Sequence, residues 1–323
     1  MQEADNVRRW DDAAHAYEVW YVTWNDPRTG AGYWLRYITE PGRGELWFAR
    51  FDPARPARTF GIHKRFPRVE STVDPFGLDI GGAHLGHDRA RGQLAGGGHD
   101  VRWDLRWDPA HRGLGVYPDL AYRYSIGPTQ FKTPNPRVAL TGSLVVDGET
   151  LVQDGAFAGQ SHVWGKKHAF AWSWAHCAEL AGADGAMFEF IGARIQRRGV
   201  TLPPLAMLVL DLDGERIGLN QFRHLVRNRA SWRTGHVTFS AWSPRVSVEG
   251  ELTCAPDALV LAPYEDPDGT DVYCANTEIG DARLVVKRFG RPPRVLESHG
   301  RCHFETGGRT RDPAVACEHV LVT

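Results

Sequence analysis

The sequence predicts an all-β protein made of two packed β domains. Short runs of apolar and aromatic residues recur along its 323 residues, and turns rich in Gly, Pro, Asn and Asp separate them. No segment shows sustained apolar spacing at i, i+3, i+4 and i+7, so helices are expected to be almost absent. The chain is long for a single core, and we expect two domains, residues 1–158 and 159–323.

The first half contains the clearest strand signals. Asn, Asp, Pro and Gly at 25–30 lie between two β-rich runs and predict a hairpin. Residues 101–107 alternate apolar with charged side chains, which predicts a half-exposed antiparallel strand. Residues 109–137 hold several prolines and are expected to be irregular, and Asp147-Gly148 then predicts a second hairpin. The strands expected here are 17–24, 33–39, 45–51, 59–66, 101–107, 138–146 and 150–152.

The second half repeats this style. Asp213-Gly214 predicts another tight hairpin, and residues 246–254 alternate apolar with polar side chains. The strands expected here are 187–195, 205–212, 215–222, 246–254, 284–288 and 300–304. Both halves are therefore expected to form antiparallel barrels or sandwiches.

Composition excludes several classes of function. Lys and Arg number 38 against 39 for Asp and Glu, which predicts neither a basic field for nucleic acid nor a polybasic anchor for an anionic membrane. The sequence contains no run of eighteen apolar residues, so no membrane span is predicted. The glycine-rich segment 74–99 lacks nucleotide-binding spacing, so no cofactor is expected. Five cysteines without a C-x-x-C pair, and no signal-like start, predict a cytoplasmic protein with reduced thiols.

The most unusual stretch, 162–176, holds three histidines and three tryptophans. On a strand, Trp172, Trp174 and His176 share one face. Two indoles beside an imidazole suit an apolar ligand with one reactive position, so Trp164, Trp172 and Trp174 are expected to line a pocket. The histidine spacings match no zinc pattern and two lysines lie between them, so no metal is expected.

The run Ser161-His162-Val163-Trp164-Gly165, followed by Trp172 and Trp174, resembles the central motif of the double-lipocalin superfamily. That superfamily comprises carotenoid 1,2-hydratase (hydroxyneurosporene synthase), AttH-like proteins and tocopherol cyclase. The resemblance implies two lipocalin-like antiparallel β-barrel domains packed together around an apolar pocket. It also implies an isoprenoid- or polyketide-derived substrate and a reaction that protonates an alkene, adds water or closes a ring.

One departure from that motif bears on the chemistry. Hydratase members have an acid at the first position, whereas this chain has Ser161, whose hydroxyl cannot usefully protonate a double bond. Histidine, which ordinarily titrates near pH ~6.5, is the next candidate donor, and this points to His162 or His176. Glu189 would replace the acid if its side chain points inward.

Structural roles are the alternative for these residues. The histidines, His168 above all, could donate to backbone carbonyls where the halves meet, and the tryptophans could seal that junction. An outward Glu189 would be an ordinary solvated charge. Gln221 and Trp232 are further candidates for substrate contacts.

Two functions remain open from the sequence. The first is a cofactor-independent cyclase, isomerase or hydratase that acts on a small apolar substrate in an aromatic-lined pocket. The second is a non-catalytic carrier of such a ligand with the same fold. The tryptophan content leaves a carbohydrate-binding β-sandwich as a third class.

Overall fold

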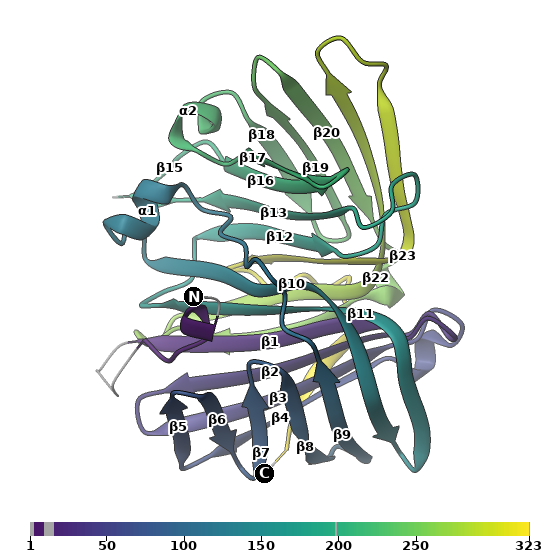
Figure 1. Ribbon diagram of the computed structural model, residues 1–323. Helices are drawn as coiled ribbons and strands as arrows, with labels where there is room; N and C mark the ends of the chain where they lie inside the picture. The colour runs from purple at the N-terminus through teal and green to yellow at the C-terminus, as the bar shows by residue number, and fades with distance from the viewer. Residues whose placement is uncertain (1–2, 10–15, 198, 323) are drawn as a thin grey trace.

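Strands form nearly all of the regular structure in the computed structural model, which describes residues 3–9, 16–197 and 199–322 (Figure 1). The first half is one antiparallel ladder in the order β5-β6-β7-β8-β9-β10-β11-β1-β2-β3-β4. Its strands are β1 (Tyr17–Asn25), β2 (Gly32–Glu40), β3 (Arg43–Phe51), β4 (Phe60–Phe66), β5 (Val69–Val73), β6 (Phe76–Ile80), β7 (Ala83–Gly86), β8 (Arg89–Gly96), β9 (His99–Trp107), β10 (Thr129–Val146) and β11 (Glu149–Gly165).

The second half forms the ladder β17-β16-β13-β12-β23-β22-β20-β19-β18, with β21 paired to the start of β22. Its strands are β12 (Ala171–Cys177), β13 (Met187–Arg194), β16 (Leu205–Leu212), β17 (Glu215–Leu219), β18 (Arg229–Arg233), β19 (His236–Trp242), β20 (Val246–Thr253), β21 (Val260–Glu265), β22 (Asp271–Arg288) and β23 (Arg294–Gly308). β14 (Gln196–Arg197) and β15 (Val200–Thr201) form a separate ribbon. These ladders confirm two antiparallel barrels packed together.

Helices are few and short in the described chain: α1 (Asp119–Arg123), α2 (Phe222–Leu225) and the 3-10 turns η1 (Glu3–Asp5), η2 (Pro56–Arg58) and η3 (Pro256–Ala258). None of them, within the described ranges, is long and apolar enough to cross a bilayer. α2 replaces the end of the strand expected at 215–222.

Residues 109–137 are more regular than the sequence predicts. They contain α1 and the first part of β10, a strand that includes Pro134 and Pro136. The register of β10 against β11 shifts on either side of Asn135. A bulged ladder needs no backbone N–H at every position, and this lets the strand accommodate proline.

The barrels are connected by the chain segment between β11 and β12 and by strand β24 (Cys317–Val322), which pairs with both ladders. β11 runs without a break through residues 158 and 159, so the change of ladder falls between Gly165 and Ala171. β24 pairs in parallel with β4 of the first barrel and with β21 of the second. The division into domains 1–158 and 159–323 stays a proposal.

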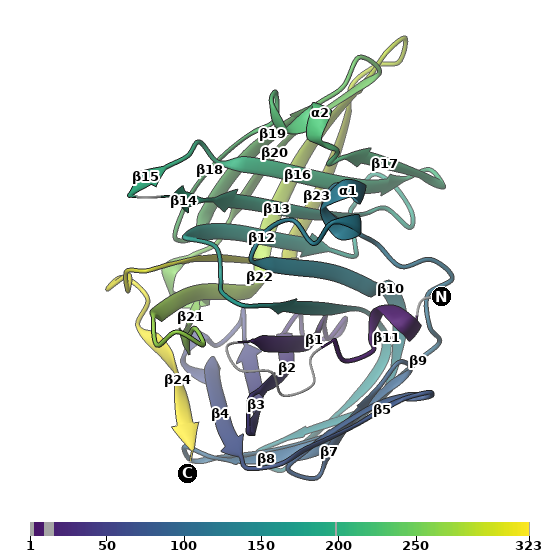
Figure 2. The same cartoon turned by 90° about the vertical axis from the view of Figure 1, so that its left-hand side faces the viewer.

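Three apolar cores explain why the central strands are buried on both faces. β1 belongs to the lower barrel in Figure 2. Its Trp20 and Trp24 pack in the core of that barrel, while its Tyr17, Val19 and Tyr21 pack in the junction core. β12 repeats the arrangement, since Ala175 and Cys177 enter the second barrel and Trp172 and Trp174 enter the junction core. The alternation predicted for this strand is therefore present.

A buried polar joint also ties the barrels together. Asn25 of β1 donates through Nδ2 to the backbone oxygen of Glu278, 2.7 Å away. Its Oδ1 therefore faces Nε2 of His303 at 2.7 Å, and Nδ1 of His303 accepts from the hydroxyl of Thr23 at 2.8 Å. Burial, with the charge of His176, lowers the pKa of His303 well below its ordinary value, so the joint is formed by a neutral imidazole.

Candidate active site between the barrels

A cavity of about 100 Å³ lies in the junction core, between β1 of one barrel and β12 of the other. Aromatic side chains dominate its wall, and the polar groups among its lining residues include Arg36, Thr129, His168 and Glu305. Its aromatic lining residues are Tyr17, Tyr21, Tyr117, Phe131, Trp172, Trp174 and Tyr264. The site thus combines an apolar aromatic wall with a few convergent polar groups, as small-molecule sites usually do.

Two carboxylates hold the indoles of the wall in place. Trp172 Nε1 donates to Glu305 Oε1 at 2.7 Å, and Trp174 Nε1 donates to Glu189 Oε1 at 2.7 Å. A buried indole N–H needs such an acceptor. Gly307 leaves room for the ring of Trp172, because a Cβ at that position would lie 2.1 Å from it.

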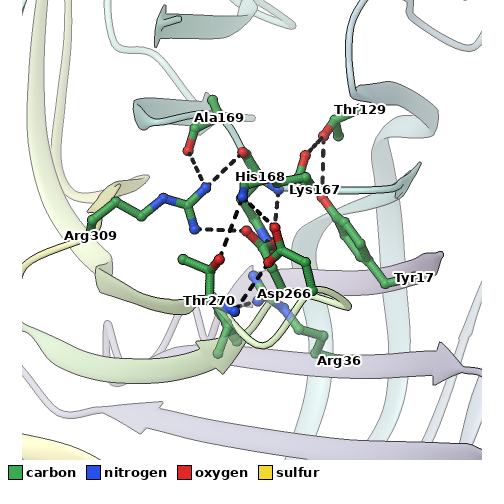
Figure 3. Close-up of polar contacts among 11 residues, drawn as sticks. Tyr17, Arg36, Thr129, Lys167, His168, Ala169, Asp266, Thr270 and Arg309 are labelled. Atoms are coloured by element: carbon green, nitrogen blue, oxygen red, sulfur yellow. Dashed lines mark hydrogen bonds and ion pairs between the residues drawn. The ribbon is translucent and has the colours of Figure 1, made fainter. Parts of the chain in front are cut away.

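His168 borders the cavity with one ring nitrogen already engaged. Its Nδ1 lies 2.6 Å from Oδ1 of Asp266, a fully buried carboxylate in the β21–β22 turn (Figure 3). The same oxygen accepts from the backbone N–H of His168 at 3.0 Å, and Oδ2 accepts from Arg309 at 2.7 Å. Burial by itself raises the pKa of Asp266, but the hydrogen bonds and charge of His168, with Arg309, hold it below its usual range. Asp266 is therefore ionised.

Three aromatic rings stack with the imidazole of His168, and one of them is the indole of Trp172 at 5.2 Å between centroids. The imidazole also stacks on Tyr17 at 4.6 Å and on Tyr264 at 5.5 Å between centroids. Tyr17 is fixed in turn, because its hydroxyl donates to Thr129, whose own hydroxyl donates to the backbone oxygen of Lys167 (Figure 3). These stacking contacts, with the bond to Asp266, fix the ring plane of His168.

Arg36 supplies a buried positive charge to the same cavity. Its guanidinium donates to the hydroxyl of Tyr264, lies 3.6 Å from Glu305 and stacks 3.8 Å above the ring of Trp34. Burial raises the pKa of Tyr264 well above its ordinary value, so the phenol keeps its proton. Arg36 and Tyr264 together offer hydrogen-bond donors to a ligand oxygen.

Glu189 points inward and is fully buried, but it does not line the cavity. Besides Trp174 it accepts from Thr133 at 2.8 Å, and it lies 3.4 Å from Nδ1 of His176. Ser161, which stands at the acid position of the resembling motif, donates to the same threonine at 3.4 Å. The structure therefore brings His176, Glu189 and Ser161 together in a polar cluster behind the indole of Trp174.

The other sequence candidates lie elsewhere. His162 is buried on the first-barrel side, between the backbone oxygen of Asp5 at 2.6 Å and Glu18 at 2.7 Å. Trp164 is half-buried beside His162. Gln221 precedes α2, and Trp232 packs against the core of the second barrel. Among these sequence candidates, only Trp172 and Trp174 line the cavity.

The sequence favours a structural role for His168, and it gives no signal for a functional role of Asp266, Arg309 or Arg36. Asp266 and Arg309 lie 98 and 141 positions from His168, so no local spacing signals the contact. Within the described residues, no group of three His, Cys, Asp or Glu side chains is arranged to hold a metal ion.

No protein-family model and no curated protein sequence matches the chain. Solved structures match its fold. An AttH-like protein from Nitrosomonas europaea superposes with a TM-score of 0.58 at 16% identity, over 95% of this chain and 96% of that one. Kievitone hydratase from Nectria haematococca gives 0.57 at 10% identity, over 95% and 92%. CghA with Sch210972 gives 0.55 at 12% identity, over 91% and 88%. The chain has the lipocalin-like double-barrel fold of these proteins.

Proposed function

We propose that this chain is a cofactor-independent enzyme of the hydratase, isomerase or cyclase type that acts on an apolar isoprenoid- or polyketide-like substrate. The observation that carries the proposal is the imidazole of His168, which borders the aromatic cavity while buried Asp266 engages its Nδ1. One protein with the same fold is by name a hydratase, and this supports the reaction class.

His168 is the proton carrier in this proposal. Because Nδ1 is committed to Asp266, Nε2 exchanges the proton with the substrate. Imidazole accepts a proton from a carbon beside a carbonyl, and the resulting imidazolium returns it to the conjugate carbon, so the enzyme ends unchanged. The ionised Asp266 stabilises the imidazolium, and the donors Arg36 and Tyr264 stabilise the negative charge that develops on the carbonyl oxygen of the substrate.

The cavity narrows the substrate class. An imidazolium is a weaker acid than a carboxylic acid, and this favours a double bond conjugated to a carbonyl over an isolated alkene. Arg36 and Tyr264 are the donors for that carbonyl oxygen. The volume of about 100 Å³ is well below the roughly 300–1,000 Å³ of sites for drug-sized ligands. We therefore place only the reacting end of the substrate in the cavity, with the remainder passing the half-buried rim at Tyr117 and Ala169.

Proton transfer can be tested before the natural substrate is known. A panel of conjugated ketones and 1,3-dicarbonyl compounds with apolar tails is incubated with the protein in D₂O, and mass spectrometry measures deuterium uptake at carbon. We expect uptake with the wild type and a loss of about 10²–10⁴-fold in its rate for His168→Gln. His111→Gln is the control, because that histidine is exposed on a loop, and it should exchange like the wild type.

Two outcomes contradict the proposal. If His162→Ala or His176→Ala abolishes exchange while His168→Gln does not, the proton carrier is one of the histidines favoured by the sequence. If native mass spectrometry of protein from its own host shows one unmodified ligand per chain, and no panel compound gains deuterium, the chain is a carrier.

A further inference from the structure

Two short helical segments expose apolar and cationic side chains side by side. The fractional exposure reaches 63% for Tyr124 after α1 and 71% for Val226 after α2. One exposed arginine lies among these apolar residues in the first segment, and three lie among them in the second. The helical patch, as we define it, consists of Leu120, Arg123, Tyr124, Ile126, Phe222, Arg223, Val226, Arg227 and Arg229.

Hydrogen bonds fix the two segments against each other. The backbone N–H of Asp119 donates to Gln221 Oε1 at 3.2 Å, and Asn220 Nδ2 donates to the backbone oxygens of Gly115 and Tyr117. Figures 1 and 2 both place α2 next to α1, beside the second barrel. The helical patch is therefore one surface held on a folded framework.

The helical patch carries four arginines, whereas its two segments contain a single carboxylate, the exposed Asp119 of α1. Several exposed arginines elsewhere pair with acids, as Arg102 does with Asp100. Among the described residues, none of the four patch arginines forms an ion pair: Arg227 lies 4.4 Å from the ring of Trp242, and Arg229 donates to backbone oxygens. Residues 219–233 contain no Asp or Glu at all. The net charge of the chain is −1, and the helical patch is nevertheless locally cationic and apolar.

The helical patch also lies on the outer surface next to the candidate active site. Tyr117, which lines the cavity, comes two residues before α1, and Leu225 of α2 packs against the junction core. An apolar substrate dissolved in lipid would reach the cavity from this side. The docking itself does not depend on the proposed reaction.

We propose that the helical patch docks the protein on membranes rich in anionic phospholipids. Apolar side chains that stand out from short helices gain free energy by entering the boundary between headgroups and acyl chains, and the arginines are attracted to the anionic headgroups. An acidic protein partner would match the arginines, but it offers no comparable apolar medium for Phe222 and Val226.

Vesicle co-sedimentation tests the proposal. The wild type is mixed with phosphatidylcholine vesicles that either contain or lack one part in three of phosphatidylglycerol. We expect binding to the anionic vesicles alone, weakened by added salt. Arg223→Gln and Arg227→Gln should each lower the affinity by about fivefold, and Phe222→Ser should lower it as well. The control is Arg102→Gln, on the exposed face of β9 and outside the helical patch, which should bind like the wild type.

Three results would overturn the docking proposal. The first is equal binding to both kinds of vesicle, and the second is wild-type binding by all three patch variants. In the third, the wild type sediments with neither vesicle but binds heparin through the patch arginines, and the partner is then an acidic macromolecule. Activity plays no part in this readout, so its failure leaves the proposed enzyme untouched.

Discussion

Replacing Asp266 by asparagine probes the geometry on which the proposed proton carrier depends. Oδ1 accepts from two donors of His168, at 2.6 and 3.0 Å, and Oδ2 accepts from Arg309 at 2.7 Å. Asparagine has one acceptor oxygen and one NH₂ group. In one orientation the NH₂ meets the guanidinium of Arg309, and in the other it meets the backbone N–H of His168, so a donor faces a donor either way.

The expected cost follows from these contacts. A buried donor left without an acceptor costs about 1–3 kcal/mol, and hydrogen bonds to a charged acceptor are roughly twice as strong as neutral ones. We therefore expect Asp266→Asn to lower the free energy of unfolding by about 2–4 kcal/mol. Asp268→Asn is the matched control two residues further along the turn. Asp268 pairs with Lys167 at 2.5 Å, but its side chain is 47% exposed, and solvent screening limits the loss to less than about 1 kcal/mol.

Urea unfolding measures both losses, and NMR of the imidazole nitrogens reports which one is protonated. In the wild type the proton should reside on Nδ1 of His168, facing Asp266. In Asp266→Asn, an NH₂ group facing Nδ1 should move the proton to Nε2. The reasoning is refuted if Asp266→Asn unfolds like Asp268→Asn and the proton stays on Nδ1.

Three further predictions concern the junction. Glu189→Leu leaves a buried indole N–H and a threonine hydroxyl without their acceptor, and it should lower the free energy of unfolding in urea by about 2–5 kcal/mol. A decrease below about 1 kcal/mol would contradict the hydrogen bonding described for Glu189. Burial, with the charges of His63 and Arg36, lowers the pKa of His319 well below its ordinary value, so below pH ~6.5 the unfolded chain binds the extra proton and stability falls. Between pH 6.5 and 5.5 the wild type should lose about 1 kcal/mol more than His319→Leu, and equal losses would show that His319 titrates normally. Gly307→Ala places a Cβ against the ring of Trp172 and should cost about 1–3 kcal/mol and change the tryptophan fluorescence, whereas Gly308→Ala, whose nearest atoms would be 3.8 Å away, should do neither.

The strand framework could be predicted from the sequence because its signals are local. Period-two alternation predicts β9 at residues 101–107, and the strand is present with its apolar face buried. Both Asp-Gly turns form as expected: Asp147 and Asp213 have φ angles of 52° and 55°, and a glycine with positive φ follows each. The same alternation placed Trp172 and Trp174 on one face of β12, and both line the cavity.

Helix α1 and the proline-containing part of β10 could not be predicted from such local signals. Both depend on partners, since Tyr122 in α1 anchors to the backbone of Phe131, and β10 tolerates its prolines only because its ladder with β11 is bulged. A stretch of sequence does not reveal which backbone groups a neighbouring strand will leave unpaired.

The sequence by itself determined the all-β class, the hairpins and the aromatic wall, because a side chain's face on a strand follows from its parity. Only the tertiary structure decided which histidine meets the cavity. His168 becomes the proton carrier we propose through Asp266 and Arg309, which are distant in sequence. The helical patch also depends on the tertiary structure, since a net charge near zero does not indicate how the charged side chains are distributed over the surface. Proton transfer and surface charge depend on distances in space, and folding brings those residues together from parts of the chain that are far apart in sequence.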